Sequence, residues 1–80
     1  MKLSKWQRPG TNEVRVYFNG ITTDSKVFAV DNDGNYEIRF SPRLYNSEQD
    51  RIMDMIDVEL REANGGEPVV KFDDLLSLCK

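Results

Sequence analysis

The stretch KVFAVDNDGNYEIRF, residues 26–40, decides the fold of this 80-residue chain. Its first five residues, 26–30, are mostly apolar on both faces, which is typical of a central strand or of a strand with a second layer above it. Residues 36–40 alternate, with Tyr36, Ile38 and Phe40 on one face. Asp33-Gly34 lies between the two runs, where this dipeptide favours a tight turn. The stretch therefore predicts a β-hairpin, which Ser41-Pro42 ends because proline cannot extend a ladder.

A third strand is predicted upstream, from Glu13 to Gly20, where apolar residues alternate with Arg15 and Tyr17. The segment 1–12 is polar, carries the turn signal Pro9-Gly10 and can be flexible. Trp6 is its exception, and we expect this side chain to cover an edge of the core or to contact a partner.

Downstream, the pattern predicts a helix from Ser47, as N-cap, to about Ala63, before the glycine pair at 65–66. Ile52, Ile56, Leu60 and Ala63 recur at helical spacing, with Met53 at the edge of the stripe, and this stripe should pack on the sheet. A short strand at 68–72 and a last helical turn or two from residue 73 follow. The expected fold is a single α+β domain over 1–80, with a three- or four-stranded, mostly antiparallel sheet packed on one main helix in the order β-β-β-α-β-α.

The residue types argue against an enzyme. Histidine is absent and Cys79 is the single cysteine, so the commonest general base, the commonest metal ligand and a disulfide are all missing. We expect no catalytic residue, no metal and no cofactor. The chain also lacks an apolar run of about 20 residues and a signal-peptide core, which predicts a cytoplasmic protein with no membrane partner. Cys79 is interpreted as inert.

Charge divides unevenly along the chain. The first 45 residues carry seven Lys or Arg against five Asp or Glu, and the remaining 35 carry four against nine. The strands are therefore slightly cationic and the helix strongly anionic, which makes two different binding surfaces conceivable.

The first surface is the acidic side of the helix, where Met55 and Val58 lie off the buried stripe. Either the C-terminal segment covers these two side chains, or they form an apolar centre inside an acidic rim that suits a basic partner. The residues assigned to this surface are Glu48, Arg51, Asp54, Met55, Val58 and Glu62.

The second surface is the outer face of the sheet, from which Arg15, Tyr17 and Arg39 should project with Val27 and Ala29 between them. Arginine pairs with phosphate and aromatic rings stack on bases, although Glu37 sits in the middle. The candidate nucleic-acid contacts are Lys5, Trp6, Arg8, Arg15, Tyr17 and Arg39.

Of the two, the sequence favours a non-enzymatic protein-binding module. Small proteins without a catalytic set often occupy a site on something larger, as do inhibitors and regulators encoded by phages and plasmids. The expected partner is a larger protein whose basic surface the acidic helix blocks, and a DNA- or RNA-binding module is the alternative. The segment from Val69 to Phe72, as an edge strand, would also permit a homodimer.

Overall fold

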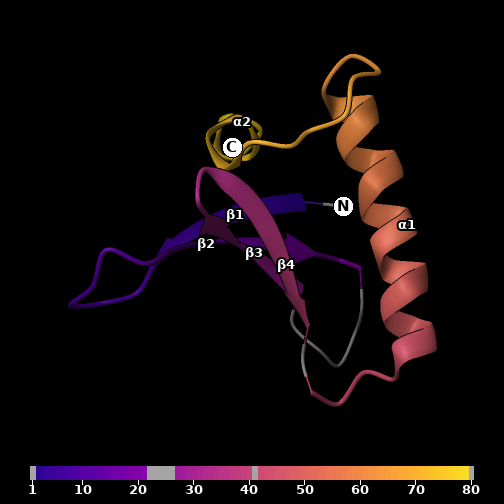
Figure 1. Cartoon of the computed structure of the whole chain (residues 1–80), viewed down its shortest axis with the longest axis horizontal. Helices are drawn as coiled ribbons and strands as arrows, with labels where there is room; N and C mark the ends of the chain where they lie inside the picture. Colours follow the sequence, from indigo (N-terminus) through magenta and orange to yellow (C-terminus); the bar gives the residue numbers. More distant parts are fainter. Residues whose placement is uncertain (1, 22–26, 41, 80) are drawn as a thin grey trace.

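The computed structural model describes residues 2–21, 27–40 and 42–79. Its sheet is a meander, because each strand pairs antiparallel with the next in the order β1-β2-β3-β4 (Figure 1). The elements are β1 (Lys2–Gln7), β2 (Val14–Asn19), β3 (Val27–Asn32), β4 (Asn35–Phe40), α1 (Asn46–Ala63) and α2 (Phe72–Ser77). This arrangement confirms the α+β class and the four-stranded sheet with one main helix.

The fourth strand comes from the N-terminal segment, where no element was predicted. β1 pairs with β2 in a register that runs from Lys2 opposite Asn19 to Gln7 opposite Val14. Only two apolar residues, Leu3 and Trp6, occur in β1, and an odd spacing places them on opposite faces. The strand therefore carries no alternation by which sequence reasoning could find it.

The predicted strand at 68–72 is wrong, because that segment makes only a single bridge, between Lys71 and Asn35. The Tyr36 amide donates to the Val70 carbonyl at 3.2 Å, and the Phe72 amide donates to the Gly34 carbonyl at 2.9 Å. These two bonds tie the segment to the β3–β4 turn before α2 begins at Phe72. Val69 and Phe72 are buried in the core, so the segment does not offer the edge strand on which the expected homodimer rested.

The two faces of β3 are the reverse of the expectation. Val27 and Ala29 pair across β2 and β4 with residues of the helix-covered face, and both are buried in the core. Phe28 and Val30 point to the outer face instead. A strand that is apolar on both faces does not reveal which alternate set meets the helix, and only the cross-strand register decides it.

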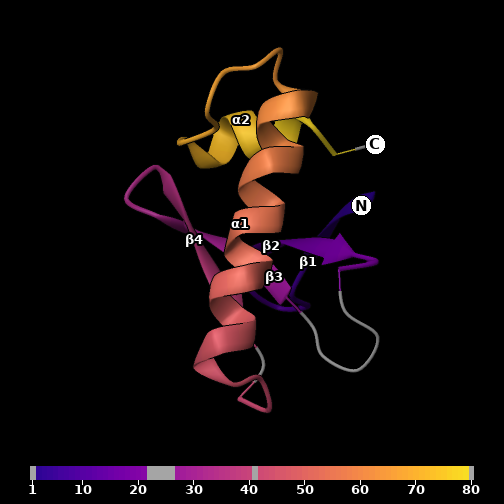
Figure 2. The same ribbon diagram turned by 90° about the vertical axis from the view of Figure 1, so that its right-hand side faces the viewer.

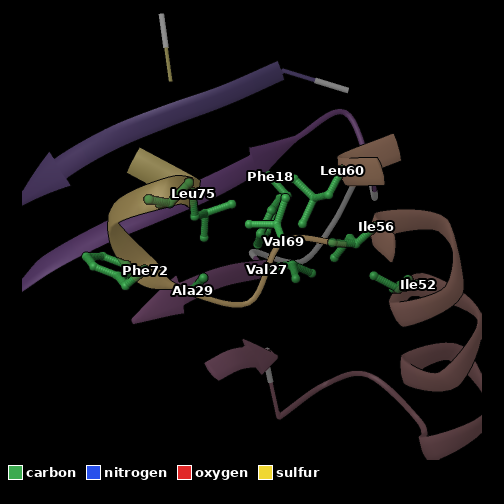
Figure 3. Packing of buried hydrophobic residues seen from close by; sticks show 10 residues of the cluster. Phe18, Val27, Ala29, Ile52, Ile56, Leu60, Val69, Phe72 and Leu75 are labelled. Carbon is green, nitrogen blue, oxygen red and sulfur yellow. The ribbon is translucent and has the colours of Figure 1, made fainter. Parts of the chain in front are cut away.

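The core lies between the sheet and the two helices. α1 crosses one face of the sheet (Figure 2) and buries Ile52, Ile56 and Leu60 there, as predicted. Ala63 and Met53, which were assigned to the same stripe, are exposed instead. Phe72 and Leu75 of α2 fill the remainder of the same core, together with Val69 (Figure 3). Within the described part of the chain, no helix packs on the outer face of the sheet.

The start of α1 differs slightly from the prediction. The helix begins at Asn46 and its N-cap is Tyr45, which makes no side-chain cap hydrogen bond. The amides of Glu48 and Gln49 both donate to the Tyr45 carbonyl at 3.0 Å. Ser47 is therefore inside the first turn and not the cap.

Candidate binding surfaces

The acidic stripe, as we call the six residues predicted for the helix, runs along the exposed side of α1, and its last residue, Glu62, also lines a groove beside the start of β1. Its central residues Arg51, Met55, Val58 and Glu62 follow one another at three- and four-residue spacing, which places them on one helical face. The full stripe is Glu48, Arg51, Asp54, Met55, Val58 and Glu62, of which Glu48 is half-buried and the other five are exposed.

The apolar centre of the acidic stripe is open. Met55 is 44% exposed and Val58 is 54% exposed. The alternative expectation, that the C-terminal segment covers them, is wrong, because α2 turns its apolar residues Phe72 and Leu75 into the core of the sheet. Two apolar side chains therefore remain in water on a helix that is otherwise charged on this side.

The charge around this centre is strongly negative. α1 carries six carboxylates against two arginines. Arg61 lies beside Asp57, with Nε 3.4 Å from Oδ2, on the flank next to the stripe. A basic partner would meet carboxylates around an apolar centre, which is the usual anatomy of a protein interface.

The acidic stripe is also held rigidly. Ile52, Ile56 and Leu60 fix the opposite side of the same helix in the core, so the stripe has little rotational freedom. Binding by a pre-formed helix face avoids the entropy cost of ordering it at the moment of association.

The outer sheet face is organised around Arg15. The guanidinium lies over the ring of Phe28, with Cζ 4.5 Å from the centroid, and 5.5 Å from the ring centroid of Trp6. Nε donates to Glu13 Oε2 at 2.9 Å, and a terminal nitrogen donates to the Tyr17 hydroxyl at 3.2 Å. The hydrogen bonds with Tyr17 and Glu13 raise the pKa of Arg15.

The aromatic rings around Arg15 contact one another as well. Tyr17 meets Trp6 edge-on at 6.3 Å between centroids and meets Phe28 in a tilted arrangement at 5.3 Å. Such pairs favour these offset geometries. Arg15 is therefore enclosed by its own neighbours, and it is a packing element of this face more than a free ligand for phosphate.

The remaining candidates for a nucleic-acid surface are dispersed. Arg39 shares the outer face but has Glu37 Oε2 3.7 Å from a terminal nitrogen. Lys5 is paired with Val16 in the register, so its side chain lies on the helix-covered side. Arg8 lies in the β1–β2 connection, where its carbonyl accepts the Thr11 amide and hydroxyl. The structure thus brings together Trp6, Arg15, Tyr17 and Arg39 and leaves Lys5 and Arg8 outside.

Sequence reasoning missed Phe28 and Val30, which complete the outer sheet face. The signal that could have found them is the pairing of β3 with β2, where Phe28 lies opposite Tyr17 and Val30 opposite Arg15. Each of the two arginines of this face lies beside a glutamate, Arg15 beside Glu13 and Arg39 beside Glu37, so their positive charges are offset.

Among residues 2–21, 27–40 and 42–79, no group of three or more His, Cys, Asp or Glu residues is placed to hold a metal ion. Within the same residues, no helix is long and apolar enough to cross a membrane. No protein-family model, no curated protein and no solved structure shows significant similarity to the chain.

Proposed function

We propose that this protein binds a larger protein through the acidic stripe of α1 and thereby blocks a basic surface of that partner. The observation that carries the proposal is the exposure of Met55 and Val58 at the centre of the stripe. Exposed single apolar residues are common, but two neighbours surrounded by carboxylates on a rigid helix match the pattern of an anchor inside a charged rim.

The mechanism of the proposed block is steric and electrostatic. Carboxylates on α1 speed the encounter with a cationic surface and select against anionic proteins. Met55 and Val58 then lose their water on contact and slow dissociation. The sheet stands behind α1 (Figure 1) and would keep other ligands from the occupied surface.

A pair of charge-matched variants tests the proposal. Asp54→Lys/Glu62→Lys reverses two carboxylates of the acidic stripe, and Glu37→Lys/Glu67→Lys makes the same total charge change on exposed residues elsewhere. Each tagged protein is used to capture partners from a nuclease-treated lysate of the cells that make it, and circular dichroism checks that each variant is folded.

The expected result is a protein captured by the native chain and by Glu37→Lys/Glu67→Lys and lost from Asp54→Lys/Glu62→Lys. Met55→Ala/Val58→Ala should weaken the same capture at least tenfold, since anchors of this kind contribute more than about 1 kcal/mol each. Equal capture by the two charge-reversed proteins would contradict the proposal. So would a partner that is captured from an untreated lysate and is absent after nuclease treatment.

Nucleic-acid binding by the outer sheet face is the less supported alternative. Its central cation, Arg15, is occupied by Glu13, Tyr17 and two rings. If that alternative holds, Arg39→Glu abolishes binding of a labelled single strand at low salt, and the affinity of the native chain falls steeply as salt rises.

A further inference from the structure

The free edge of β1 is a second place where this molecule can pair with a partner. β1 and β4 are the two edge strands of the sheet and lie at its opposite edges (Figure 2). The start of the β4 edge is occupied, because the Tyr36 amide donates to the Val70 carbonyl and the Phe72 amide donates to the Gly34 carbonyl. Among the described residues, no backbone group outside β2 bonds to β1 along Lys2–Gln7.

The register shows which backbone groups of β1 face outward. The Arg8 amide donates to the Glu13 carbonyl at 2.9 Å, which makes the pair just beyond β1 a hydrogen-bonded one. Hydrogen-bonded and non-hydrogen-bonded pairs alternate along an antiparallel ladder. Leu3, Lys5 and Gln7 are therefore the non-hydrogen-bonded positions, and their amides and carbonyls point away from β2.

A groove accompanies this edge on the helix-covered side. It lies between the start of β1, the C-terminal half of α1 and the end of α2. Its lining is Lys2, Leu3, Glu59, Leu60, Glu62, Ala63 and Leu78. A strand added to β1 would turn every second side chain toward this groove, and an apolar side chain opposite Leu3 would meet Leu60, Ala63 and Leu78 there.

Charge decides what kind of strand fits. Between residues 2 and 12 the chain has three cations and no carboxylate. Lys2 lines the groove together with Glu59 and Glu62, whose charges oppose its own, so Lys5 and Arg8, both exposed, are the main cations offered to a partner. A second copy added antiparallel about Lys5 would place two lysines directly opposite each other, which disfavours self-pairing.

We propose that the free edge of β1 binds an extended acidic peptide segment by strand addition, with carboxylates opposite Lys5 and Arg8 and an apolar side chain in the groove beside Leu3. Main-chain hydrogen bonds supply affinity in this mode, and alternate side chains supply specificity. On the outer side, Trp6 is 42% exposed and offers its ring to the neighbouring side chain of the added strand. This surface adjoins the acidic stripe at Glu62, which lines the groove, but it is selective for the opposite charge.

The test uses a defined peptide and the full chain. In antiparallel pairing, the blocked heptapeptide ETVETLE places glutamates opposite Arg8, Lys5 and Lys2, valine opposite Trp6 and leucine opposite Leu3. Two matched peptides accompany it: KTVKTLK, with reversed charge, and ETVETLE methylated on the three backbone nitrogens that would face β1. Binding is followed by amide chemical shifts and hydrogen exchange on the ¹⁵N-labelled protein.

The expected result is saturable binding of ETVETLE that slows exchange of the Leu3, Lys5 and Gln7 amides at least tenfold. KTVKTLK and the methylated peptide should bind at least tenfold more weakly. Lys5→Glu should lose ETVETLE binding, whereas the control Lys71→Glu, with the same charge change at an exposed site beside the other edge, should keep it.

Four outcomes would overturn the proposal. The first is that the methylated peptide binds as tightly as ETVETLE, which would mean that charge attraction, and not main-chain hydrogen bonding, explains the binding. The second is that ETVETLE changes the chemical shifts and the exchange rates of acidic-stripe amides only. The third is a homodimer seen by light scattering whose formation protects the β1 amides, which would assign the edge to a second copy. The fourth is a single-stranded oligonucleotide that protects these amides at lower concentration than the peptide does.

Discussion

Replacing Ile56 by alanine tests the orientation of α1, on which the acidic stripe depends. Ile56 is 1% exposed and lies between two other buried residues of the helix, Ile52 and Leu60. The change removes three carbon atoms from the core, and at about 0.8 kcal/mol per buried methylene the transfer part alone is roughly 2.4 kcal/mol. The cavity left behind adds to this, so we expect a loss of about 3–4 kcal/mol.

The matched control is Met55→Ala, one position earlier. Met55 is 44% exposed, so the truncation removes little buried surface, and alanine is the better helix former by a few tenths of a kcal/mol. The free energy of unfolding should therefore stay within about 0.5 kcal/mol of the native value. Ile56→Ala and Met55→Ala, at neighbouring positions of one helix, should therefore differ widely in their free energy of unfolding.

The measurement is urea unfolding followed by far-ultraviolet circular dichroism, with the fluorescence of Trp6 as a second probe of two-state behaviour. For a domain of this length, Ile56→Ala should lower the melting temperature by more than about 10 °C, and Met55→Ala should barely change it. If Met55→Ala destabilises as much as Ile56→Ala, then α1 is rotated or Met55 is covered. The acidic stripe would then lack its apolar centre.

Three other residues give further predictions. Gly34→Ala should lower the free energy of unfolding by about 1 kcal/mol, measured by the same urea titration, because Gly34 has φ +89° and alanine is strained there although its Cβ meets no atom; an unchanged midpoint would contradict this. Burial, and secondarily the carboxylate of Asp57, raises the pKa of Tyr36, so the folded state holds the phenol proton more tightly than the unfolded state and stability should fall as the pH rises above about 10. Asp57→Asn should lower that pKa in an absorbance titration at alkaline pH, and an unchanged or higher value would refute the interaction. Arg15→Lys should lower the urea midpoint and change the Trp6 emission spectrum, because lysine lacks the planar fork that reaches two partners while stacked on two rings; native-like values for both would show that the enclosure of Arg15 is not stabilising.

Local patterns predicted the parts of the fold in which one physical effect dominates. The hairpin around Asp33-Gly34 followed from turn chemistry, and the buried side of α1 followed from the spacing of Ile52, Ile56 and Leu60. In both cases the information lies within a few residues of chain. Which face of β3 packs against the helix could not be predicted from its residues, because only the pairing of β3 with β2 and β4 determines it.

The ends of the chain were the least predictable for a related reason. β1 is a strand because β2 offers it a partner, and nothing in KLSKWQ alternates strongly enough to show this. The segment before Phe72 has the residues of a strand, but it makes one bridge and then turns into α2. In both segments the outcome is set by tertiary contacts that outweigh local propensity.

The same limit applies to the candidate surfaces. The acidic stripe could be predicted by position because a helix fixes its own faces, but its exposure depended on where α2 packs. The outer sheet face was predicted as basic from Arg15 and Arg39, yet a glutamate and two aromatic rings enclose the first and a glutamate lies beside the second. Charge counted along the chain does not show which cations remain available on the surface.

The meander also sets an order of events during synthesis. The four strands leave the ribosome before the two helices and pair with their sequence neighbours, so they close short loops at little entropic cost. Their apolar side, with Val16, Phe18 and Ala29, then has no cover until α1 has emerged, and α2 arrives last to join the β3–β4 turn. A nascent chain halted near residue 45 would expose this apolar side of the sheet to chaperones, and the core is complete only after Phe72 and Leu75 have been translated.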